Sequence, residues 1–138
     1  MSNVTQLRDK KPENEKITIN LGFVDLGRID LLVQEGFYSN RSDLIRTAIR
    51  NQLESHGEVV SKSLERHTME LGLRDYSVSD LETVREAGEV LHIKVVGLAR
   101  FDPDITPELA LQTIASITVL GALQASTAIK KALADRIK

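Results

Sequence analysis

The stretch from Lys16 to Leu53 constrains the fold of this chain more than any other part of the sequence. It begins with KITINL, in which polar and apolar side chains alternate strictly. This alternation predicts a short β-strand over 16–21 with one apolar face. No neighbouring segment offers a hairpin partner, and a lone strand leaves its backbone donors and acceptors unpaired. The sequence therefore predicts that this strand pairs with the same strand of a second chain.

Two helices are expected after the strand. Apolar residues at helical spacing predict the first helix, and Gly36 stands where its C-terminal cap is needed. Asn40 is the expected N-cap of the second helix, with Asp43 placed to accept a hydrogen bond from the amide of Asn40. Because neither strand nor helix can bury its apolar face alone, we expect an intertwined dimer with a core of Ile17, Ile19, Leu21, Leu44, Ile45 and Ile49.

In its KITINL strand, its glycine stop and its N-R-S-D helix start, the stretch resembles the ribbon-helix-helix DNA-binding proteins of the CopG, Arc and MetJ type. In that family two strands pair antiparallel across a dimer axis and enter the major groove, while the second helices hold phosphates at their N-termini. The resemblance implies that outward strand residues read bases and that the helix start binds the DNA backbone. By position, the base-reading residues are Lys16, Thr18 and Asn20, and the phosphate-binding residues are Ser39, Asn40, Arg41 and Ser42.

The whole chain is expected to be an α+β protein with several segments. Residues 1–15 are polar and read as a disordered arm, and residues 16–57 form the ribbon-helix-helix domain in the order β-α-α. An amphipathic linker helix over 58–72 follows, and residues 73–138 form a small α/β module for oligomerisation.

An internal repeat organises the C-terminal module. Ile93 aligns with Ile117 and Gly97 with Gly121, an offset of 117 − 93 = 24 residues. Each copy reads as a strand followed by a helix, which predicts parallel strands in a solenoid-like unit; the alternative is an accidental repeat in an ordinary α/β domain. Thr106 and Ser126 or Thr127 are expected to open the helices. A partial earlier copy is expected at Ser79, where Ser79 and Glu82 form a capping box and Gly88 ends the helix.

Charge and composition limit the possible functions. With 18 basic and 20 acidic residues the net charge is −2, so the chain is no general electrostatic binder of nucleic acid. Without cysteine it has neither disulfides nor thiolate metal sites, and its polar start leads us to expect no signal segment. The uncharged stretch 109–129 contains several Gln, Ser and Thr residues, which favours a buried segment over a membrane span. A cytoplasmic, bacterial-type nucleoid-associated location is expected.

No motif for catalysis or metal binding is found in the sequence. His56, His67 and His92 are scattered rather than grouped at ligand spacing, and neither a phosphate-binding glycine loop nor a nucleophile elbow occurs. We therefore expect no enzyme activity, no metal and no cofactor.

Two functions from different classes remain. The first is a sequence-specific transcriptional regulator, a repressor, which binds a double-stranded DNA operator as a homodimer and forms a higher oligomer through its C-terminal module. The alternative is an antitoxin or protein-assembly factor whose C-terminal repeat is the main interaction surface. Thr18, Asn20 and the N-R-S-D helix start favour the regulator. The size of the C-terminal module favours the alternative.

Overall fold

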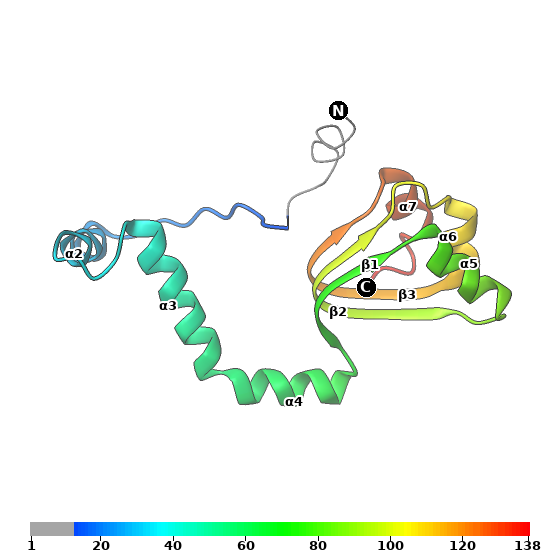
Figure 1. Ribbon diagram of the computed structural model, residues 1–138, viewed down its shortest axis with the longest axis horizontal. Helices are drawn as coiled ribbons and strands as arrows, with labels where there is room; N and C mark the ends of the chain where they lie inside the picture. The colour runs from blue at the N-terminus through cyan, green and yellow to red at the C-terminus, as the bar shows by residue number, and fades with distance from the viewer. Residues whose placement is uncertain (1–12) are drawn as a thin grey trace. The chain divides into compact units, whose positions relative to one another are not determined.

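The computed structural model describes residues 13–138, which divide into two compact units (Figure 1). Residues 14–63 form the N-terminal unit, and residues 64–138 form the bulk of the C-terminal unit. Most of the predicted arm, residues 1–12, lies outside the described residues.

Helices make up the N-terminal unit. Its helices are α2 (Phe23–Gln34) and α3 (Arg41–Ser55), and α4 (Gly57–His67) leads from it into the next unit. Gly36 follows α2 with a φ of 88°, in the left-handed conformation that the sequence predicts for a cap. Although α2 packs on α3, neither helix contains a buried residue. The apolar stripes of this unit therefore stay open to solvent in the single chain.

The predicted strand is not formed in the single chain. Residues 16–21 run as an extended trace in Figure 1 and carry no strand assignment, so the β-α-α order is not seen here. The physical reason is that a strand requires hydrogen bonds to a neighbour, and no strand of the described residues lies against this segment. The strands that do form are parallel and belong to the C-terminal unit, whereas the expected ribbon is antiparallel.

The linker helix also ends earlier than the sequence predicts. The prediction was a helix over 58–72, but α4 stops at His67 and a strand begins at Glu70. Thr68 separates the two elements with a φ of 54°, in the left-handed region that a threonine rarely adopts. Because Thr68 is not glycine, no residue type in the sequence signals this turn.

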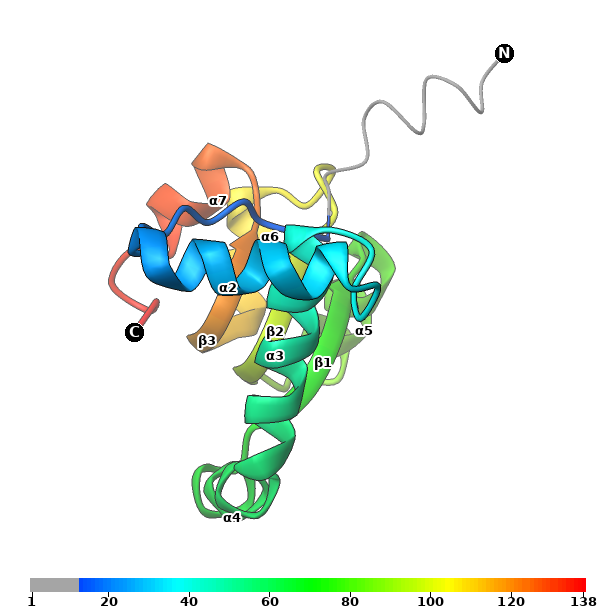
Figure 2. The same cartoon turned by 90° about the vertical axis from the view of Figure 1, so that its left-hand side faces the viewer.

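A three-stranded parallel sheet and three short helices build the C-terminal unit. In chain order the elements are β1 (Glu70–Tyr76), α5 (Val78–Glu86), β2 (Leu91–Phe101), α6 (Pro107–Thr113), β3 (Ile114–Gln124) and α7 (Thr127–Ala132). The strands lie side by side in the order β1-β2-β3 (Figure 2), and α5 packs on α6 as α6 packs on α7. Between strands and helices lies one apolar core, with Leu81, Ile93, Ile117 and Leu133 among its buried residues.

Strand pairing matches the residues that the sequence offset aligns. Ile93 pairs with Ile117 and Gly97 with Gly121, while Gly72 of β1 pairs with Gly97. The expected capping box at Ser79 and Glu82 is wrong, because Ser77 caps α5 and exchanges hydrogen bonds with Asp80. Starting the helix at Ser77 places Leu81 in the core with no exposed surface. Thr106 and Ser126 cap α6 and α7, as the sequence predicts.

Glycines occupy one position in all three strands. Gly72, Gly97 and Gly121 have φ values of 131°, 140° and 119°, which break the regular extended backbone and account for the curvature of the strands in Figure 1. A Cβ on Gly97 would lie 2.1 Å from the carbonyl oxygen of Gly72. The strands can therefore approach this closely only because no side chain is present.

The uncharged stretch 109–129 is divided among α6, β3 and α7. Among the described residues, no helix has the length and apolar character needed to cross a membrane.

Candidate nucleic-acid interface

The start of α3 brings the predicted phosphate-binding residues together. The side chain of Asn40 accepts a hydrogen bond from the amide of Asp43 at 2.8 Å. The carboxylate of Asp43 in turn accepts a 2.9 Å bond from the amide of Ser39, one residue before the expected donor Asn40. This reciprocal cap leaves the amides of Arg41 and Ser42 with no acceptor among the described residues. Such amides at a helix start suit an anion.

The guanidinium of Arg41 is held by α2. Its Nε donates a 2.8 Å hydrogen bond to Oδ1 of Asp30, and its Nη2 donates a 2.8 Å hydrogen bond to Oδ2. These bonds lower the pKa of the Asp30 carboxyl and raise the pKa of Arg41. Arg41, which the sequence predicts to bind phosphate, is therefore already paired with a carboxylate of the same unit. Sequence reasoning missed Asp30, because residues that meet across a turn have no characteristic spacing along the chain.

The predicted base-reading residues lie exposed on the extended segment. Lys16, Thr18 and Asn20 alternate there with Ile17, Ile19 and Leu21, whose side chains are 75%, 58% and 38% exposed. The single chain thus covers neither face of the segment. An apolar face of this kind is stabilised by a partner that removes it from water.

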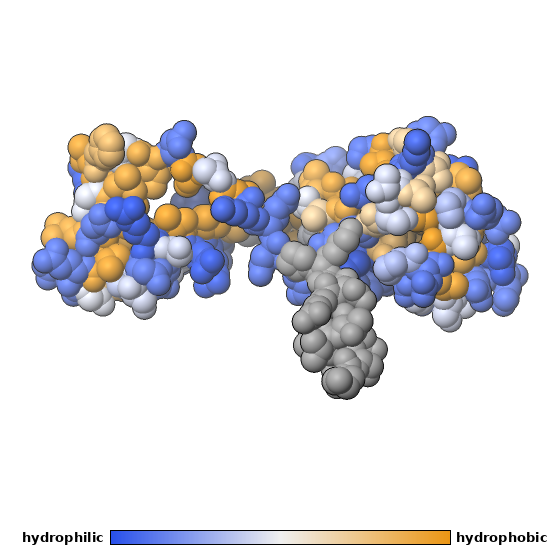
Figure 3. All heavy atoms as spheres, turned by 90° about the horizontal axis from the view of Figure 1, so that it is seen from above, coloured by the Kyte–Doolittle hydropathy of each residue, from blue (hydrophilic) through white to orange (hydrophobic). Residues whose placement is uncertain are grey.

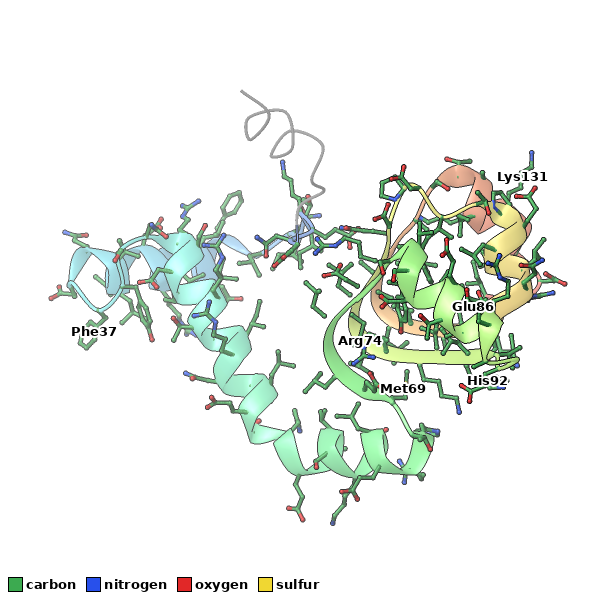
Figure 4. All side chains as sticks on the ribbon, turned by 45° about the vertical axis from the view of Figure 1, so that its right-hand side comes forward. Phe37, Met69, Arg74, Glu86, His92 and Lys131 are labelled. Atoms are coloured by element: carbon green, nitrogen blue, oxygen red, sulfur yellow. The ribbon has the colours of Figure 1, made fainter. Side chains whose placement is uncertain are left out.

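The predicted dimer core continues over the helices. Leu44 and Ile45 are half-buried and Ile49 is 46% exposed. Further apolar side chains that the sequence reading did not single out are also exposed, among them Phe23, Val24, Leu31, Phe37 and Leu53. Figure 3 shows apolar residues open on the surface of this unit, and Figure 4 labels Phe37 after α2. Their number and their spread over α2 and α3 indicate a surface made for a second chain.

The three histidines lie on different elements: His56 caps α3, His67 ends α4 and His92 lies on β2. His92 lies 3.0 Å from the hydroxyl of Ser116, and His56 lies 3.2 Å from the amide of Gln52. In the part of the chain that the structure describes, no three His, Cys, Asp or Glu residues are grouped so that they could hold a metal ion.

Comparison with known protein families shows to which family this chain belongs. The model of the Ribbon-Helix-Helix transcriptional regulator family matches residues 12–130, which is most of the chain. The chain is a member of this family. Comparisons with curated proteins and with solved structures gave no match. Membership supports DNA binding, transcriptional regulation and dimerisation for this ribbon-helix-helix regulator. The match also runs through β3, so it includes most of the C-terminal unit.

Proposed function

We propose that two copies of this regulator pair residues 16–21 antiparallel and insert the resulting ribbon into the major groove of an operator. The observation that carries this proposal is the exposed, strictly alternating segment at the start of a chain that belongs to the family. Pairing would cover Ile17, Ile19 and Leu21 and leave Lys16, Thr18 and Asn20 facing the bases. Repression follows where such an operator overlaps a promoter.

The start of α3 would hold the DNA backbone. This helix start offers the amides of Arg41 and Ser42 and the polar side chains of Ser39, Asn40 and Ser42. Contacts to phosphate carry no sequence information. Asp30 neutralises Arg41, and the whole chain has a net charge of −2. Non-specific affinity is therefore expected to be modest, and specificity is expected to depend on the ribbon.

We propose that this chain is not an enzyme and needs no cofactor, and that it binds its DNA in the cytoplasm. The C-terminal unit favours a second role, which is self-association into a higher oligomer that binds adjacent operators cooperatively. The alternative of an antitoxin or assembly factor would use the same unit against another protein.

Replacing Asn20 by Ala tests the reading role. An Asn can bond adenine in a bidentate manner, so N20A should lose about 1–3 kcal/mol on an operator selected from a random duplex pool and little on random DNA. Titrations on both duplexes over a range of salt measure this. Asn51→Ala is the matched control, because Asn51 is exposed on α3 and lies outside the segment 16–21. Equal losses on both duplexes, or no loss on either, would show that the segment does not read bases.

A further inference from the structure

The two edges of the C-terminal sheet differ in whether other residues of the chain cover them. On β3, Ile117 is paired with the C-terminal residues: its amide donates to the carbonyl of Arg136 at 2.9 Å, and its carbonyl accepts from Lys138 at 2.8 Å. Arg136 fixes this cover by donating to the carbonyls of Leu111 and Ile114 at 2.7 Å. The other edge is β1, which no strand of the described residues covers. Leu71 and Leu73 on β1 are 68% and 41% exposed.

The residues of β1 are complementary to themselves. The sequence from Glu70 to Arg74 is ELGLR, so reversing its direction about Gly72 places Glu opposite Arg and Leu opposite Leu. A two-fold axis at Gly72 therefore sets Glu70 against Arg74 of a second copy, and Arg74 against Glu70 of that copy. Leu71 faces Leu73 of the second copy in the same register. Opposite charges and apolar pairs directly across an antiparallel pair are both stabilising.

The bend of the strand selects the same axis. Gly72 has a φ of 131°, and the glycines paired along its column mark where the strands depart from a straight course. Two bent strands can pair along their length only if their bends coincide. In an antiparallel pair this occurs when Gly72 lies opposite Gly72. A Cβ built on Gly72 meets no atom within 4 Å, so this position is open toward a neighbour.

Charge disfavours the rival arrangement, in which β1 of one copy continues the parallel sheet on β3 of the next. In that stack the glycine column would place Glu70 on Val119 and Arg74 on Leu123. Both charged side chains line a depression of about 130 Å³ that β1 and β2 share (Arg74 is labelled in Figure 4), and they are bonded to each other at 3.2 Å. Covering them with an apolar strand end would remove their water without supplying new partners.

We propose that β1 is an interaction surface for β1 of a second copy of this chain, paired antiparallel about Gly72 into a continuous sheet. The inference rests on the proposed self-association of the C-terminal unit and names the strand that performs it. It is independent of DNA binding, so it is tested without DNA.

Cysteine cross-linking of the full chain tests the register. The chain contains no cysteine, so Leu71→Cys and Leu73→Cys each introduce a single thiol. Residues directly opposite have Cβ atoms roughly 4.5–5.5 Å apart, close enough for a disulfide after small adjustment, whereas diagonal neighbours are too far. After the two variants are mixed and allowed to exchange, the mixture should form a cross-linked pair in much higher yield than either variant alone. A mixture of Leu71→Cys with Leu120→Cys reports the parallel stack.

Charge reversal tests the proposed pairs across the axis. Glu70→Arg alone sets Arg against Arg, and Arg74→Glu alone sets Glu against Glu, so each should weaken β1 pairing on the order of tenfold. Mixing these two variants restores Arg opposite Glu at both positions and should recover the pairing. The ion pair within one chain cannot produce this recovery, because each variant has lost it.

For this test the charge changes are placed in the Leu71→Cys and Leu73→Cys chains, and cross-linking is the readout. Glu58→Arg and Lys62→Glu are matched controls, because that exposed pair on α4 has the same spacing and a similar 3.1 Å separation. Cross-linking that persists through both single reversals would overturn the charge pairing. A higher yield for Leu71 with Leu120 would overturn β1 as its own partner while leaving self-association intact. No cross-link in either mixture would overturn both the β1 pairing and the self-association of the C-terminal unit.

Discussion

At the scale of single residues, the exposed pair of Arg41 and Asp30 decides how much charge the helix start offers to DNA. The bidentate bonds hold the guanidinium on α2, and they lower the pKa of Asp30 below its ordinary value of 3.8. A carboxyl with a lowered pKa contributes stability above that ordinary value, and the contribution is lost as the pH falls through the lowered pKa. The pair is therefore intact at neutral pH, where phosphate must compete with Asp30 for Arg41.

Replacing Asp30 by Asn should strengthen binding to DNA. Without the carboxylate, Arg41 can pair with a phosphate, so affinity should rise on specific and random duplexes alike and the salt slope should steepen by roughly one. Binding titrations at neutral pH over a range of salt measure both quantities. The double variant Asp30→Asn with Arg41→Ala is the control and should lose the gain. A slope unchanged by Asp30→Asn would mean that Arg41 does not reach the backbone.

At the scale of helices and strands, several helix ends whose signals are local were predicted correctly, whereas the capping box expected at Ser79 and Glu82 lies at Ser77 and Asp80. Gly36 after α2, Asn40 before α3 and Thr106 before α6 are local caps, and each acts through groups within a few residues. The end of α4 at a left-handed Thr68 was missed, because threonine rarely adopts that conformation. Local bonds from the amides of Thr68 and Met69 to the carbonyls of Glu65 and Leu64 close the helix there. The Arg41 and Asp30 pair was missed because only the packing of α2 on α3 brings its members together.

The glycine column gives a prediction about the strands. Both Gly97→Ala and Gly72→Ala force a side chain into a positive φ, which costs about 1–3 kcal/mol. At Gly97 the new Cβ would also lie 2.1 Å from the carbonyl oxygen of Gly72, whereas at Gly72 it meets nothing within 4 Å. Gly97→Ala should therefore destabilise the C-terminal unit beyond that range, and Gly72→Ala should stay within it when both are made in the Glu70→Arg chain, whose β1 pairing is weakened. Urea unfolding of the two variants measures the difference, and equal losses would contradict the close approach of the strands.

At the scale of the whole molecule, the two units differ in what they can bury alone. The C-terminal unit encloses a core with fully buried side chains such as Leu81 and Ile114. In the N-terminal unit neither α2 nor α3 has a buried residue, so its fold must depend on a second chain. This division explains why the sequence predicts a partner chain, whereas the single chain forms no strand at residues 16–21. The alternating residues predict a strand, but its backbone hydrogen bonds can form only with a neighbouring strand.

Unfolding of the N-terminal unit should consequently depend on protein concentration. For an obligate dimer each tenfold dilution removes about 1.4 kcal/mol of apparent stability, which for a dimeric unit of this size lowers its midpoint by roughly 5–10 °C. Thermal scans over a hundredfold dilution measure this, with hydrogen exchange of the amides in α2 and α3 as the readout. The Glu70→Arg chain is the useful background, because weakened pairing at β1 leaves the ribbon as the main source of concentration dependence. A midpoint that stays constant over the series would show that α2 and α3 are stable without a partner.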